Sequence, residues 1–65
     1  MVVHNGKTYT ANDLTRIGNN LASVWGGACY SFTVDPENEK VIFDCIEHGE
    51  KFCSELSYAE LQENL

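Results

Sequence analysis

The spacing of apolar residues changes once along this chain, at Gly26-Gly27, and that change limits what the chain can fold into. Before the glycines, Leu14, Ile17 and Leu21 recur at the spacing of one helix face. After them, residues 28–34 alternate apolar with polar side chains, which is typical of a half-buried strand. Because 65 residues make one small core, we expect a single α+β domain over residues 1–65.

The first helix is predicted over residues 11–25. Thr10 stands at the N-cap position, and Asp13 lies in the first turn, where a carboxylate is favourable. Gly26-Gly27 ends the helix, because glycine accepts the left-handed conformation of a C-terminal cap. We read Gly18 as a point of close packing on a sheet. We expect Trp25 in the core, with an interface anchor as the alternative.

Turn signals divide the rest of the chain. Asn5-Gly6 indicates a tight hairpin, and hence an N-terminal β-ribbon. Asp35-Pro36-Glu37-Asn38 is a turn between strands over 28–34 and 40–47, and His48-Gly49 leads to a strand over 52–56. Ser57 and Glu60 then form the capping box of a short second helix, whose apolar side is Tyr58, Leu61 and Leu65.

The turn lengths predict the register of the sheet. A two-residue His48-Gly49 turn pairs Cys45 with Phe52, Phe43 with Ser54 and Val41 with Leu56 on one apolar face. In the preceding hairpin, the four-residue turn puts Tyr30 and Phe32 on that same face. The predicted order is ββ-α-βββ-α, a small antiparallel sheet (a three-stranded meander plus the N-terminal β-ribbon) packed by two helices on one face.

Negative charge is concentrated in the second half of the chain. Nine of the ten Asp and Glu residues follow Val34, whereas the four Lys and Arg residues are divided equally. The first 34 residues therefore carry a formal +1 and the last 31 carry −7, which gives the net −6. Such crowding costs self-repulsion unless a cationic partner relieves it. Acidity also serves solubility, and charged strand edges discourage sheet association.

Composition excludes several classes of protein. A pI near 4.5 argues against direct binding to nucleic acid, which needs a basic surface. No run approaches the ~20 apolar residues that cross a bilayer, and the start lacks the features of a secretory signal, so we expect a cytosolic protein. Three cysteines cannot all pair within one chain, so we expect reduced thiols.

No motif for catalysis or for a metal or other cofactor is present. Cys29, Cys45, His48 and Cys53 lack the close pairing of ligands in structural zinc sites, and the register puts Cys45 and Cys53 on opposite sheet faces. No motif places a histidine beside a thiol as a catalytic base. We expect no enzyme activity and no cofactor.

The predicted partner-binding residues are acids of the sheet and its loops. Glu47 and Glu50 oppose each other at one end of the sheet, which destabilises a strand pair unless a partner relieves it. Asp44 and Glu55 lie on the face turned away from the first helix, beside Ile42 and Ile46, unless the N-terminal ribbon covers that face. The full set is Asp35, Glu37, Glu39, Asp44, Glu47, Glu50 and Glu55.

In size, single-domain build, acidity and lack of catalytic motifs, the whole chain resembles small acidic phage-encoded inhibitors of bacterial defence, above all anti-CRISPR proteins. The resemblance implies a non-enzymatic inhibitor in the cytoplasm of the bacterial host. Such an inhibitor binds the basic, nucleic-acid-binding surface of a CRISPR-Cas effector complex and blocks target DNA binding by DNA mimicry. We expect a monomer.

Two functions of other classes remain open. One is a small regulatory or adaptor protein that binds a partner through the apolar and acidic face around Ile42 and Ile46. The other is a Cys/His metal module.

Overall fold

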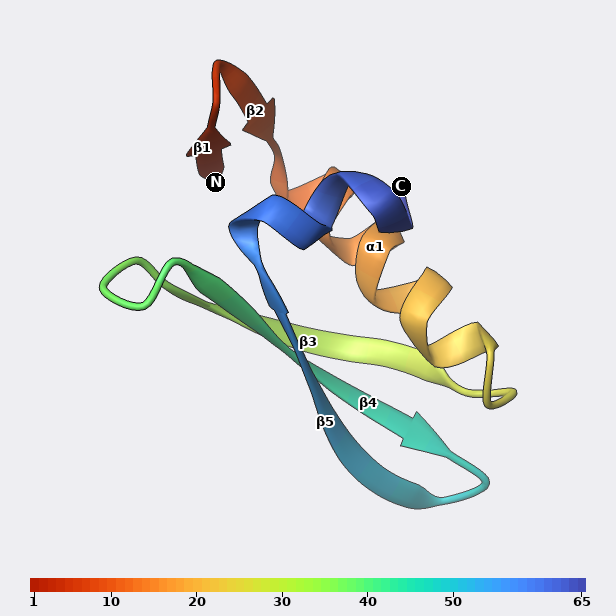
Figure 1. Cartoon of the computed structure of the whole chain (residues 1–65). Helices are drawn as coiled ribbons and strands as arrows, with labels where there is room; N and C mark the ends of the chain where they lie inside the picture. Colours follow the sequence, from red (N-terminus) through yellow and green to blue (C-terminus); the bar gives the residue numbers. More distant parts are fainter.

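The computed structural model describes all 65 residues of the chain. Its elements are β1 (Val2–His4), β2 (Lys7–Tyr9), α1 (Ala11–Ser23), β3 (Ala28–Asp35), β4 (Lys40–Glu47), β5 (Glu50–Ser57) and the 3₁₀ helix η1 (Tyr58–Asn64). β1 and β2 form a two-stranded ribbon, and β3, β4 and β5 form an antiparallel sheet in that order (Figure 1). The predicted α+β class is confirmed, with a 3₁₀ helix in place of the second α-helix.

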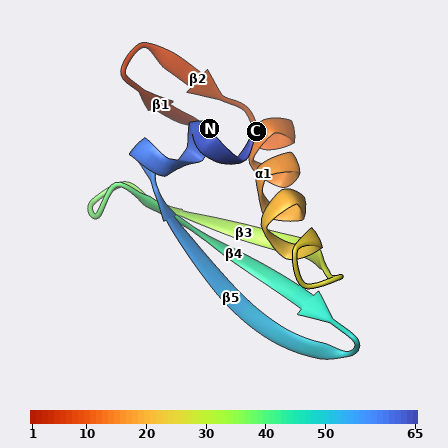
Figure 2. The same ribbon diagram turned by 45° about the vertical axis from the view of Figure 1, so that its right-hand side comes forward.

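All other elements lie on one side of the three-stranded sheet. α1 packs along β3 and β4, while the ribbon β1–β2 contacts α1 and η1 (Figure 2). The ring of His4 in the ribbon lies 5.9 Å from that of Tyr58 in η1, centroid to centroid. The suggestion that the ribbon covers the far face of the sheet is therefore wrong. We call that uncovered side the open face.

Helix α1 begins at Ala11, as its sequence predicts, but it ends at Ser23, two residues before the predicted end at Trp25. The Thr10 hydroxyl accepts a hydrogen bond from the Asp13 amide at 3.2 Å, and the Asp13 carboxylate accepts one from the Thr10 amide at 3.0 Å. The bond from the Thr10 amide lowers the pKa of Asp13. At the other end, the amides of Gly26 and Gly27 bond to the carbonyls of Ser23 and Ala22, with Gly26 at a φ of 77°.

Gly18 brings α1 close to the sheet, as predicted. A Cβ atom at this position would lie 2.5 Å from the Cys29 sulfur and 2.8 Å from Cδ1 of Phe43. Nearby, the Asn19 side chain accepts a hydrogen bond from the Cys29 amide at 3.0 Å. Helix and sheet are therefore joined both by contact and by a polar bond.

The β4–β5 register is the predicted one, whereas the β3–β4 hairpin differs from the prediction. Asp35 pairs with Lys40, so the four-residue turn is 36–39 and not 35–38, and a β-bulge interrupts the register near the start of β3. Cys45 faces Phe52 and Val41 faces Leu56. On β3, Cys29 faces Cys45, but the register shifts before Ser31, so that Tyr30 has no partner of its own. A bulge places two residues opposite one. The prediction that Tyr30 faces the core is consequently wrong, because its side chain is 56% exposed.

The core lies between α1, η1 and the inner face of the sheet. Its buried residues are Val2, Tyr9, Leu14, Ile17, Ala22, Val41, Phe43, Cys45, Leu56 and Leu61. Phe32 packs against this cluster, with its ring centroid 6.5 Å from that of Phe43. No charged or polar residue is buried with them.

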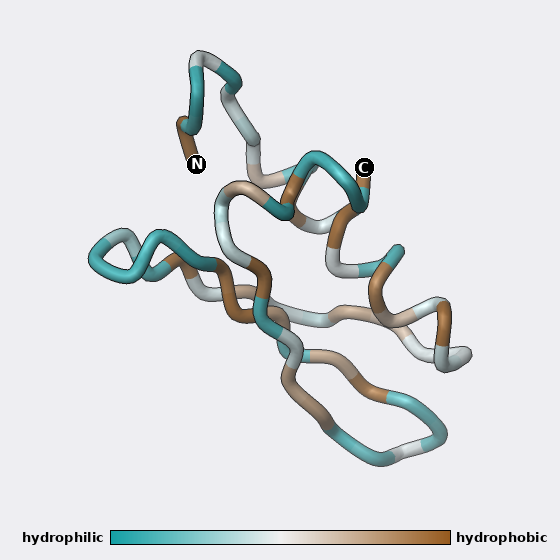
Figure 3. The backbone as a smooth tube through the Cα atoms, in the orientation of Figure 1, coloured by the Kyte–Doolittle hydropathy of each residue, from teal (hydrophilic) through white to brown (hydrophobic).

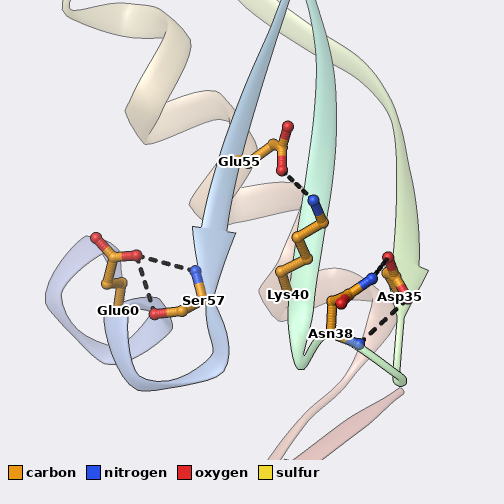
Figure 4. Close-up of polar contacts among 6 residues, drawn as sticks. All are labelled: Asp35, Asn38, Lys40, Glu55, Ser57 and Glu60. Carbon is orange, nitrogen blue, oxygen red and sulfur yellow. Dashed lines mark hydrogen bonds and ion pairs between the residues drawn. The ribbon is translucent and has the colours of Figure 1, made fainter.

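The C-terminal helix η1 starts at the predicted capping residues. The Ser57 amide and hydroxyl both donate to Oε1 of Glu60, at 3.0 and 2.9 Å (Figure 4). The Tyr58 amide donates to the Glu39 carbonyl at 2.9 Å, which ties η1 to the β3–β4 turn. Leu61 is buried, but Leu65 is 43% exposed and lies outside the core, contrary to its predicted place on the apolar side.

Candidate interaction surface

The seven predicted partner-binding acids lie in three places. Three lie at the β3–β4 end of the sheet: Asp35 as the last residue of β3, and Glu37 and Glu39 in the turn. Two lie on the strands of the open face, Asp44 and Glu55, and two lie at the tip of the β4–β5 hairpin, Glu47 and Glu50. Figure 3 shows hydrophilic residues, coloured teal, at both far ends of the sheet. The structure thus spreads these acids along the sheet, whose domain measures 37 × 21 × 16 Å.

Asp35 has a structural role in the β3–β4 turn. Its carboxylate accepts hydrogen bonds from the Asn38 side chain at 2.9 Å and from the Asn38 amide at 3.4 Å (Figure 4). The side-chain bond is the main cause of the lowered pKa of Asp35. Because its oxygens already have partners within the chain, Asp35 is less available to another protein than Glu37 or Glu39.

Glu55 is paired within the molecule. Its carboxylate lies 2.6 Å from the Lys40 ammonium, on the adjacent strand (Figure 4). The hydrogen bond and the charge of Glu55 raise the pKa of Lys40. The pair is solvent-exposed, so it adds little stability, but it does neutralise one acid of the open face.

The rest of the open face mixes apolar, acidic and aromatic side chains. The Cys53 thiol donates to Oδ1 of Asp44 at 3.2 Å, and this bond raises the pKa of Cys53. Ile42 and Ile46 flank Asp44 on β4 and are half-buried. The Lys51 ammonium lies 5.7 Å from the centroid of the Tyr30 ring. The predicted placement of these isoleucines and of Cys53 on the outer face is confirmed.

At the hairpin tip, Glu47 and Glu50 are directly paired across the strands. The intervening His48 and Gly49 both have positive φ, 48° and 83°, as a two-residue type I′ turn requires. The nearest basic group is the exposed His48 ring, with Nε2 3.9 Å from a Glu47 oxygen. No Lys or Arg forms an ion pair with either glutamate.

A shallow pocket of about 250 Å³ opens beside these glutamates. It is lined by Trp25, Glu47, Glu50, Lys51 and Phe52, and we call it the tip pocket. Trp25 is 63% exposed, so its predicted core position is wrong. The physical reason is that α1 ends at Ser23, and the following turn carries Trp25 off the buried stripe towards the hairpin tip. The sequence offers Trp25 as an interface anchor but carries no short-range signal that places it beside Glu47 and Glu50.

The cysteines are distributed between both faces of the sheet. Cys29 and Cys45 face each other on the core side, whereas Cys53 is exposed on the open face. Burial is the main cause that raises the pKa of Cys45 to about 11. The structure places no three His, Cys, Asp or Glu side chains together as metal ligands.

Comparison with protein-family models, with curated proteins and with solved structures found no match to this chain. None of its helices has the length and apolar character needed to cross a membrane. The site must therefore be interpreted from its own chemistry.

Proposed function

We propose that this protein is a non-enzymatic acidic inhibitor. It binds the basic, nucleic-acid-binding surface of a CRISPR-Cas effector complex and blocks target DNA binding by DNA mimicry. The observation that supports this proposal most is that the acids lack internal counter-ions. Of the nine carboxylates after Val34, only Glu55 pairs with a Lys or Arg of the chain. Of the other eight, Glu60 and Glu63 lie on η1, on the helical side, so six acids of the sheet and its turns have no Lys or Arg partner within the chain.

The density of this charge is compatible with competition against DNA. A duplex carries one charge per about 1.7 Å of axis, so a stretch as long as this domain, 37 Å, carries about 22 charges. About half of them, roughly 11, face a bound protein on one flank. The six unpaired acids along the sheet supply about half of that number. Complementary charge speeds encounter with a basic site and repels DNA from it.

The proposal is tested with purified, guide-loaded CRISPR effector complexes of several types and a labelled target duplex. Protein added before DNA should inhibit DNA binding, whereas protein added after DNA should inhibit it much less. Inhibition should also weaken as salt rises, because charge dominates the encounter. Absence of inhibition in every complex, or inhibition that is independent of salt and of the order of addition, would show that the proposal is wrong.

Two variants that change the net charge by the same amount, at different places, locate the interface. Glu50→Lys alters the hairpin tip, and Glu63→Lys alters η1, on the helical side of the molecule. Both residues are exposed, so both variants should keep the far-UV circular dichroism spectrum of the parent. Inhibition should fall strongly for Glu50→Lys and little for Glu63→Lys. Equal loss in the two variants would indicate dependence on net charge alone.

A second candidate function is favoured by the open face. No element of the chain covers it, and it carries Ile42 and Ile46 together with the exposed Tyr30. A regulatory or adaptor protein would bury this surface against its partner, because burial of apolar groups supplies affinity. Such binding should change little with salt and should survive Asp44→Asn, but it should be lost in Ile46→Asp.

A further inference from the structure

We propose that the tip pocket receives one arginine side chain from the basic partner, with the guanidinium between the Trp25 ring and the Glu47 and Glu50 carboxylates. The inference rests on the proposed function only in that it takes the partner to be basic. Its evidence comes from the walls of the pocket, its rim and the positions of the chain's own cations.

The apolar walls of the pocket are aromatic. Trp25 is the only tryptophan of the chain, and it is 63% exposed at a concave site, while Phe52, which also lines the pocket, is half-buried. A cation over an indole face gains more than over any other aromatic side chain. Exposed tryptophan is also typical of the few residues that dominate binding energy in interfaces. The fold holds Trp25 here because Gly27 packs closely on the end of β4: a Cβ atom added at Gly27 would lie 3.2 Å from Cβ of Glu47.

The rim of the pocket carries two like charges that no Lys or Arg relieves. Glu47 and Glu50 are direct partners in the β4–β5 register, so their Cβ atoms are about 5 Å apart. Directly opposed like charges destabilise a strand pair. A guanidinium donates along several directions in one plane and can bond to both carboxylates, which relieves this repulsion.

The two cations of the three-stranded sheet, Lys40 and Lys51, are occupied elsewhere. Lys51 contributes to the pocket lining, but its ammonium lies over the Tyr30 ring on the open face. Lys40 is paired with Glu55. The pocket, at about 250 Å³, is smaller than the 300–1,000 Å³ of sites for drug-sized ligands and suits a single side chain. Arginine fits better than lysine, because a planar guanidinium both stacks on the ring and bonds to two carboxylates.

The test is a titration of the intact protein followed by Trp25 fluorescence. The probes are N-acetyl-arginine amide, the lysine equivalent, and the citrulline equivalent, which has nearly the same shape without the charge. We expect a saturable change in emission with the arginine probe, at least about threefold weaker binding of the lysine probe, and no response to citrulline. Equal responses to arginine and citrulline, or none to arginine, would refute the inference.

Variants test the rim and the wall separately. Glu50→Gln removes one charged hydrogen bond and should weaken arginine binding about tenfold, whereas Glu37→Gln, at the opposite end of the sheet, should leave it unchanged. For Trp25→Ala, amide shifts of Glu47 and Glu50 in NMR spectra replace the fluorescence signal, and saturation should be lost. Retained binding in Trp25→Ala would show that the ring does not form the site.

This test separates the inference from the proposed function. If an effector complex is inhibited but the arginine probe does not bind, the pocket is not an arginine site and the proposed function stands. If the probe binds but no effector complex is inhibited, the pocket is an arginine site and the proposed function is wrong. If the probe binds and an effector complex is inhibited, Trp25→Ala should weaken binding to that effector complex about 30-fold, as expected of an interface hot spot.

Discussion

Gly18→Ala tests how closely α1 packs on the sheet. At an exposed helix position, replacing glycine by alanine stabilises a protein by about 1 kcal/mol. Here the new methyl group would lie 2.5 Å from the Cys29 sulfur and 2.8 Å from the fully buried Phe43 ring. Overpacking costs about 1–3 kcal/mol, and two such contacts in the core favour the upper end.

The expected net effect of Gly18→Ala is a loss of about 2 kcal/mol in the free energy of unfolding. Overpacking costs about 3 kcal/mol, and the better helix propensity of alanine offsets about 1 kcal/mol of it. For a domain of this size the melting temperature should fall by roughly 10 °C. Urea denaturation followed by far-UV circular dichroism measures the free energy of unfolding, and thermal denaturation measures the melting temperature. Asn12→Ala, on the exposed side of the same helix, is the matched control and should stabilise by a few tenths of a kcal/mol.

A second variant isolates the contact with the sulfur. Cys29→Ala removes the atom closest to the new methyl group, so Gly18→Ala should be less damaging in that background than in the parent protein. A Gly18→Ala protein as stable as the parent, or more stable, would refute the close packing of helix and sheet at this point.

Four further predictions concern local contacts. Thr10→Ala removes the N-cap of α1 and should lower the free energy of unfolding by about 1 kcal/mol in urea denaturation, and an unchanged value would contradict the capping geometry. Iodoacetamide at pH 8 should modify Cys53 first and Cys45 last in a mass-spectrometric time course. Cys45 is buried with a pKa raised to about 11, so its thiolate form appears only as the pH rises towards that value. Asp44→Asn should speed the reaction of Cys53, because the hydrogen bond and charge that raise the pKa of Cys53 are lost, and an equal rate would refute that role. Glu47→Gln should stabilise the fold by about 0.2–1 kcal/mol at low salt and by less at high salt, because it removes a like-charge pair across the strands.

The local elements of this fold could be predicted from short stretches of chain. Asn5-Gly6 and His48-Gly49 form tight turns because their backbones accept positive φ. Thr10 and Asp13 form a capping box because the required atoms are three residues apart. The β4–β5 register follows from its two-residue turn together with the apolar alternation of both strands. In each case the interaction is completed within a few residues.

The candidate site was predicted only in part. Its acids were identified from composition and strand alternation, and so were Ile42 and Ile46 on the outer face. Which acids keep a free charge could not be predicted, because the Lys40–Glu55 pair depends on side-chain positions across two strands. The tip pocket was missed because Trp25 and Glu50 are 25 positions apart and meet only when α1 is docked on the sheet.

The sequence by itself determined the α+β class, the helix caps, the tight turns and the β4–β5 register, since these depend on backbone preferences and on the period of apolar residues. Only the tertiary structure decided that Tyr30 faces outward and that Trp25 is exposed beside Glu47 and Glu50. The first depends on a bulge where α1 meets β3 through Gly18, Asn19 and Cys29. The second depends on where the turn after Ser23 rests against β4. Both are contacts between distant segments, and no short-range signal specifies them.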